Sequence, residues 1–435
     1  MIRRRTPATT VIVIACSIVV MRAQAPAPPA QPPAPAAQAP LGASLTIDQA
    51  VREALDHNLT LLAERFNVDV AAAAVRTASL RPNPVLTANL VWPDWGLVDG
   101  GISPYEQVFR TDYVLERGGK RARRIDQAGL SKSITELQLL NTTRTIILDV
   151  EGAFTDVQLA KLNLALAQDN LKAFNNVVQI NTDRVRAGDL SQVELSRSRL
   201  AALQFQNDVR QKATRLRVAK NRLSTLLGRG PSGETLDVTG DLRKDPGPAD
   251  YEALRQQALA TRPDLRAVRT DQARSVADLR LQIANGKVDY TVSGEYHRQE
   301  GSAIRGNSYG LFFSAPLPIF NRNQGEIARA RVQQQQLRTR VQALEHDISS
   351  EMISAYAEYS SAHEIVDTIE RQMLAQAAEV RTATEYAYRR GEATFVEFLD
   401  AVRAFNETMQ SYNEARAGYA RSLYVLDSIA GKVNP

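Results

Sequence analysis

Cysteine and histidine are scarce in this 435-residue sequence. Cys16 is the only cysteine, so no disulfide can form within the chain. The four histidines, at positions 57, 297, 346 and 363, have no second histidine or cysteine three or four residues away, and no HExxH, P-loop or glycine-rich dinucleotide pattern occurs. We therefore expect no enzymatic activity, no cofactor and no metal site.

Proline is missing from two long stretches, between Pro104 and Pro231 and between Pro318 and Pro435. Because proline interrupts helices, both stretches can hold helices of unusual length. In the second stretch, apolar residues recur in steps of three and four at Leu337, Val341, Leu344, Ile348, Met352 and Ala355. This pattern predicts a helix over 324–390, about 100 Å long, which must lie along partner helices as a coiled coil or bundle.

That predicted helix ends at the sequence RRGE, 389–392, where Gly391 can take the left-handed conformation of a helix C-terminus. Thr394 and Glu397 then form a capping-box pattern that predicts a new helix over 394–430. The two helices form a hairpin with a tight tip. An equivalent hairpin is predicted from helices over 119–186 and 191–227.

The first 25 residues have the order of a secretory signal peptide: three arginines, an apolar run too short to span a membrane, and Ala23-Gln24-Ala25. Cys16 follows Val13-Ile14-Ala15, which loosely resembles the lipid-attachment site of bacterial lipoproteins, and the alternative is a small apolar residue of that run. Cleavage after residue 25 removes four of the 53 basic residues and leaves the rest nearly balanced by the 48 acidic ones, so nucleic acid is not an expected partner. Residues 26–44 are rich in proline and alanine and predict a stiff, extended linker.

From residue 45 onward the sequence contains an internal duplication, whose two copies are offset by about 204 residues. The sequence TIDQAVREALDHNLTL at 46–61 corresponds to DYEALRQQALATRPDL at 250–265, and RAGD at 186–189 corresponds to RRGE at 389–392. We expect a first copy over 45–230, a connecting segment over 231–249, a second copy over 250–431 and a tail over 432–435.

Each copy contains two predicted strands between its helices, over 85–92 and 107–115 in the first copy and around 290–296 and 309–313 in the second. One face of these strands is apolar and aromatic, and the other is polar. The apolar face comprises Leu86, Leu90, Trp92, Phe109, Tyr113, Tyr290, Tyr296, Tyr309, Leu311 and Phe313. Such strands fit either a membrane β-barrel shared among several chains, because four strands cannot close alone, or a half-buried sheet packed on the helices. The fold class is mainly α with a small β part.

Together, the signal peptide, the duplicated helix–strand–strand–long-helix unit and the glycine-centred tips resemble the TolC-type outer-membrane efflux protein family. The resemblance covers 45–431, and its most specific piece is GEATFVEFLDA at 391–401. The segments PNP at 82–84 and PLPIF at 316–320 agree with its strand boundaries. It implies a homotrimer with a twelve-stranded barrel in outer-membrane lipid and a helical tunnel across the periplasm. Members are passive ducts for small molecules or metal ions that dock on a periplasmic adaptor and an inner-membrane RND-type pump.

The resemblance also implies roles for single residues. Glu397 and Asp400 match the acidic pair that narrows the periplasmic end of the tunnel. Tyr388 and Glu194 match a link between helices near that end, although the arginine that usually joins them is replaced by Ala393. The tip residues match the adaptor-docking loops: Arg186, Gly188, Asp189, Arg390, Gly391 and Glu392.

Two alternatives stay open on sequence grounds. Glu397 can be a capping residue and Asp400 part of a solvated helix face. The whole chain can also be a secreted or periplasmic coiled-coil structural protein without a pore.

Overall fold

The computed structural model describes residues 44–92, 105–230, 236–245, 250–300 and 305–432. The predicted signal peptide with Cys16, almost all of the linker, both ends of the connecting segment and most of the tail lie outside these residues.

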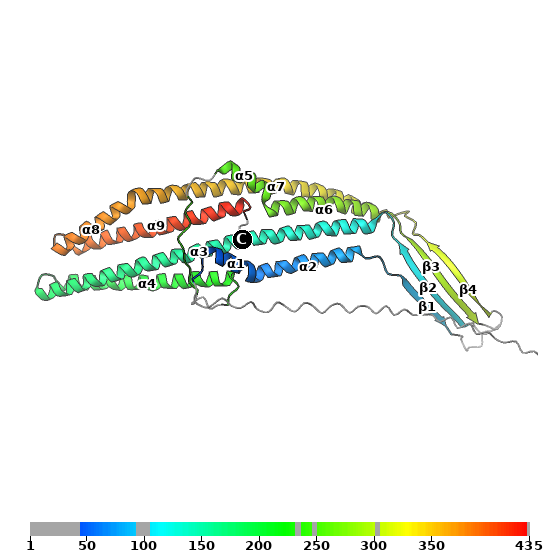
Figure 1. Ribbon diagram of the computed structural model, residues 1–435, viewed down its shortest axis with the longest axis horizontal. Coiled ribbons are helices and arrows are strands. Elements are labelled where there is room, and N and C mark those ends of the chain that lie inside the picture. Colours follow the sequence, from blue (N-terminus) through cyan, green and yellow to red (C-terminus); the bar gives the residue numbers. More distant parts are fainter. Residues whose placement is uncertain (1–43, 93–104, 231–235, 246–249, 301–304, 433–435) are drawn as a thin grey trace, which may run out of the picture. The chain divides into compact units, whose positions relative to one another are not determined.

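The order of elements repeats along the chain (Figure 1), and the chain is mainly helical with one small sheet, as predicted. The first series is α1 (Ile47–His57), α2 (Leu59–Ser79), β1 (Val85–Val91), β2 (Tyr105–Leu115), α3 (Lys120–Ala187) and α4 (Gln192–Leu226). The second series is α5 (Tyr251–Thr261), α6 (Pro263–Asn285), β3 (Tyr290–Glu300), β4 (Arg305–Ser314), α7 (Gln324–Thr368), α8 (Leu374–Arg390) and α9 (Phe395–Ile429).

The four strands form one antiparallel sheet in the order β1-β2-β3-β4, so the strands of the two copies pair through β2 and β3. The register aligns Ala88 with Phe109, Phe109 with Tyr296, and Tyr296 with Tyr309. Because directly paired residues lie on the same side of a sheet, the predicted apolar residues share one face. The start of β1, the end of β2, the start of β3 and the end of β4 lie together where the sheet meets the helices (Figure 1).

The two long helices differ in one respect that the sequence did not predict. α3 is a single helix of 68 residues, whereas the helix expected over 324–390 contains a π-helical turn, Ile369–Met373, between α7 and α8. Glu370 in this turn accepts hydrogen bonds from Lys244 Nζ (2.9 Å) and from the Tyr412 hydroxyl (2.9 Å). These contacts hold the wide turn against α9 and the connecting segment.

Among the residues that the structure describes, the buried apolar side chains form four clusters. The two larger clusters lie one in each copy: α1, α3 and α4 build the first, and α5, α6, α7 and α9 build the second. The two smaller clusters bridge the copies, one of them near the hairpin tips, where Phe174 of α3 packs against Phe398 of α9. Within the described part of the chain, no helix is both long enough and apolar enough to cross a membrane.

Candidate functional site

The hairpin tips are turns that depend on glycine. Gly188 ends α3 with φ +86°, and Gly391 ends α8 with φ +81°. The residue after each glycine donates its backbone N–H to a carbonyl of the last helical turn: Asp189 to Arg184 (2.9 Å) and Glu392 to Ala387 (2.9 Å). A side chain at either glycine would strain the turn. The predicted tip residues 186, 188, 189 and 390–392 are all exposed.

The predicted acidic pair lies in the first two turns of α9. Thr394 is the N-cap, and its backbone N–H (2.7 Å) and hydroxyl (3.0 Å) both donate to Glu397 Oε2. These bonds hold the pKa of Glu397 below its usual value. Glu397 and Asp400 are both exposed in the protomer and lie one helical turn apart. Glu397 therefore caps α9, and the carboxylates of Glu397 and Asp400 both remain exposed in the protomer.

Tyr388 is buried beside the tips and joins the two hairpins. Its hydroxyl donates to Oδ1 of Asn181 on α3 (2.7 Å), and the predicted link to Glu194 stays a prediction. The Tyr388 ring stacks on Phe398 with centroids 5.1 Å apart, and burial raises the pKa of its phenol.

Two residues of this link, Asn181 and Arg184, were missed in the sequence. Arg184 Nη1 reaches the backbone carbonyl of Tyr388 (3.5 Å), so a cation is present here although Ala393 replaces the expected arginine. Asn181 is fully buried, and its Nδ2 has no hydrogen-bond partner within the described chain. Their position in the sequence was a signal that could have identified them, because Asn181 and Arg184 lie in the last two turns of α3, beside the first tip.

The residues predicted to face lipid are largely exposed in the protomer. Leu311 is 89% exposed, Tyr309 75% and Leu86 69%. On the opposite face Arg110 and Asp112 form an ion pair (2.8 Å), and Arg110 also donates to Ser293 (3.1 Å). The sheet therefore has one apolar and one hydrogen-bonded polar face, and the helices do not cover the apolar one.

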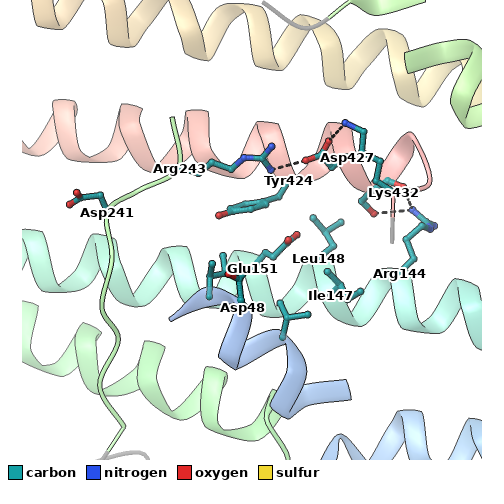
Figure 2. Close-up of a pocket in the computed structure, with 13 residues that line it drawn as sticks. Asp48, Arg144, Ile147, Leu148, Glu151, Asp241, Arg243, Tyr424, Asp427 and Lys432 are labelled. Carbon is teal, nitrogen blue, oxygen red and sulfur yellow. Dashed lines mark hydrogen bonds and ion pairs between the residues drawn. The ribbon is translucent and has the colours of Figure 1, made fainter. Parts of the chain in front are cut away.

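A cavity of about 380 Å³ lies between α1, α3, the segment 236–245 and α9 (Figure 2). Charged side chains of both signs line it: Asp48, Arg144, Glu151, Asp241, Arg243, Asp427 and Lys432. Most of them are paired, since Asp427 binds both Arg243 (2.7 Å) and Lys432 (2.8 Å), and Arg144 Nη1 donates to the carbonyl of Ser428 (3.1 Å). The Arg144–Ser428 bond ties α3 of the first copy to α9 of the second, and the Arg243–Asp427 pair ties the connecting segment to α9.

Glu151 is a partly buried carboxyl group of this cavity. Burial raises its pKa to about 7, although the Arg243 charge opposes the shift. Burial also raises the pKa of the neighbouring Tyr424 phenol to about 12. In the residues that the structure describes, no three His, Cys, Asp or Glu side chains are grouped as a metal site requires. The cavity is lined by charged side chains of α1, α3, the connecting segment and α9.

Comparison with known proteins by family model, by sequence and by structure finds outer-membrane efflux proteins in each case. The family model described as outer membrane efflux protein matches residues 50–229 and 254–432. The cobalt-zinc-cadmium resistance protein CzcC of Cupriavidus metallidurans is 23% identical over 388 residues, 89% of this chain and 90% of that protein. The pyoverdine export outer membrane protein OpmQ of Pseudomonas putida is 24% identical over 66% of this chain and 62% of that protein. Among solved structures, CusC superposes with a TM-score of 0.75 at 18% identity, covering 90% of this chain and 93% of that one.

Proposed function

Since the chain belongs to the outer membrane efflux protein family, it is an outer-membrane efflux duct that extends into the periplasm, and we propose that acidic rings close its periplasmic end. Each of three copies contributes Glu397 and Asp400, which then stack as two rings around the axis. The same trimer closes the three sheets into a twelve-stranded barrel with the apolar face toward lipid.

The observation that supports the rings is the exposure of both carboxylates one helical turn apart, directly after the Gly391 tip. The capping bonds from Thr394 lower the pKa of Glu397, so this carboxylate stays ionised at neutral pH. Rings of carboxylates in a narrow pore favour cations over anions. Cationic cargo, metal ions included, is therefore the class that this entrance would admit.

The exposed tips are the proposed docking surface for a periplasmic adaptor, which in turn connects the duct to an inner-membrane RND-type pump. Arg186, Asp189, Arg390 and Glu392 carry both signs of charge on these tips and are exposed. The Tyr388–Asn181 hydrogen bond behind the tips holds the two hairpins together. An adaptor bound at the tips would therefore lie close to a bond that keeps the hairpins closed.

Single-channel conductance and reversal potential in planar bilayers test the acidic rings. We expect a low, cation-selective conductance for the wild type, and a severalfold higher, less selective one for Glu397→Ala with Asp400→Ala. The matched control is Glu364→Ala with Glu379→Ala, which removes two exposed carboxylates of α7 and α8 that have no ion pair among the described residues. Equal conductance and selectivity in all three proteins would refute the acidic rings.

A further inference from the structure

Exposed positive charge is concentrated at the end of the sheet where the strands join the helices. The residues that we call the basic collar are Arg81, Arg117, Arg121, Arg123, Lys287 and Arg322. Each stands in the short segments or first helical turns next to the four strand ends that meet there. The collar therefore draws on all four connections between the sheet and the helices.

Contacts between these segments keep the collar together. Arg121 Nε donates to the carbonyl of Ser79, at the end of α2 (2.6 Å). Gly118 lies against the Lys287 side chain, and a Cβ at Gly118 would come within 2.9 Å of it. A Cβ at Gly286 would come within 2.6 Å of the Arg322 carbonyl oxygen. Residues from distant parts of the sequence thus form one surface.

The collar charge is not neutralised inside the protomer. Asp289 pairs with Lys120 (2.7 Å), and Glu116 pairs with Arg124, so the carboxylates next to the strand ends are already used. None of the six collar residues has an ion pair with a carboxylate of the described chain, and all six are exposed. Asp126, one turn further along α3, is an exposed carboxylate that also has no ion pair among the described residues.

Exposed apolar side chains accompany this charge. Phe320 is 89% exposed, Leu317 78%, Leu80 65% and Ile319 62%, and all four lie in the same connections between strand and helix. Cations beside exposed apolar side chains are typical of protein surfaces at the boundary between lipid tails and headgroups.

The other end of the sheet, as far as the structure describes it, has no comparable group of unpaired arginine and lysine residues. Arg298 pairs with Glu300 (2.6 Å), and Arg305 lies 3.3 Å from the same carboxylate. The positive charge therefore belongs to one side of the apolar face, the side from which the helices extend into the periplasm.

We propose that the basic collar binds the phosphate groups of anionic phospholipids in the periplasmic leaflet of the outer membrane. This inference rests on the placement of the sheet in that membrane. Juxtamembrane arginine and lysine residues attract anionic headgroups within about one Debye length of the surface. The first turns of α3 and α7 add to the attraction, because both begin here without a side-chain cap and present free N–H groups. Headgroup binding at the collar fixes the depth of the sheet in the bilayer.

Native mass spectrometry of the trimer released from nanodiscs of equal phosphatidylethanolamine and phosphatidylglycerol tests the proposal. We expect the wild type to retain phosphatidylglycerol about tenfold over phosphatidylethanolamine. A variant with Arg81→Gln, Arg123→Gln, Lys287→Gln and Arg322→Gln should retain both lipids equally. Two controls should keep the preference: the charge-conserving set Arg81→Lys, Arg123→Lys, Lys287→Arg and Arg322→Lys, and an α4 set, Arg197→Gln, Arg210→Gln, Arg215→Gln and Arg217→Gln.

An unchanged preference in the collar variant would overturn the proposal, as would loss of the preference in the α4 set. Displacement of the lipid by inorganic phosphate at constant ionic strength would also overturn it, because the collar would then be a general phosphate site. A wild type that stays dispersed without detergent and retains neither lipid would instead refute the membrane placement of the sheet.

Discussion

The interior of each copy and the seam between the copies are built from different chemistry. Inside the copies, helices pack through large apolar clusters such as Val150, Phe154 and Leu223 in the first and Ile348, Met352 and Leu423 in the second. Along the part of the seam that joins the two hairpins, where α3 meets α9 and Tyr388 of α8, small apolar clusters alternate with polar pairs. The pairs include Asp156–Arg421 (2.6 Å), Asn163–Asn413 (3.1 Å) and Asn181–Tyr388 (2.7 Å).

This difference assigns different roles to the two regions: the apolar clusters stabilise each copy, and the polar pairs set the register in which the two copies pack. Burial of large apolar side chains supplies most of the folding free energy, whereas a polar pair adds little net stability but is costly when one partner is missing. Buried asparagines in helical bundles fix which residues face one another. We infer that each copy is held firmly by its own core and that the seam sets how the two copies meet. The seam is therefore where the hairpins can separate at the least cost.

Phe154→Ala should have the largest effect, because it opens a cavity in the core of the first copy. Phe154 is 1% exposed, and truncation of a buried phenylalanine costs about 3–5 kcal/mol. We expect a clear fall in the thermal unfolding midpoint followed by circular dichroism in detergent. Phe66→Ala is the control, since Phe66 is 68% exposed in the protomer. Equal falls in both variants would contradict the assigned core.

Local signals in the sequence predicted most elements to within a few residues. The tip at Gly391 and the cap formed by Thr394 and Glu397 were visible because each depends on neighbours at most a few residues apart. The π-helical turn was missed because Lys244 and Tyr412, which hold Glu370, come from other elements.

The partner of Tyr388 was missed for the same reason. Asn181 lies 207 residues earlier in the sequence, and only the packing of one hairpin against the other brings its side chain to the phenol. The predicted roles of the acidic pair and the tips depend on other chains, so the geometry of one protomer supplies their exposure and leaves those roles as proposals.

Glu151→Gln should have an intermediate, pH-dependent effect at the seam. The folded protein raises the pKa of Glu151 from its usual 4.5 to about 7, so the stability linked to its protonated form is complete below pH 4.5 and is lost as the pH rises through 7. The groups that face it are Asp48 of α1, Arg243 and Asp241 of the connecting segment, and Tyr424 and Asp427 of α9.

We expect the wild type and Glu151→Gln to unfold at similar temperatures at pH 4.5. Above pH 7 the variant should be more stable by about 2 kcal/mol, a value reduced from the full pKa shift because the carboxyl is partly exposed. Glu364→Gln, at an exposed position, is the control. Parallel pH curves for Glu151→Gln and the wild type would show that the seam does not bury this carboxyl.

Tyr388→Phe should have the smallest effect on stability, about 1–2 kcal/mol, because it leaves the buried Oδ1 of Asn181 without its donor but keeps the stacked ring. Tyr386→Phe, on the same helix at a 60% exposed position, should change nothing measurable. The midpoint of thermal unfolding checks both expectations.

The double variant Tyr388→Phe with Asn181→Leu sharpens the comparison, since it replaces both members of a buried pair by apolar groups. Such replacements can be nearly neutral in stability. If the pair sets register rather than stability, the double variant should unfold at the wild-type temperature and still conduct more ions than the wild type in a planar bilayer. Wild-type conductance at wild-type stability would mean that the apolar cluster around Phe174 and Phe398 is enough to hold the hairpins closed.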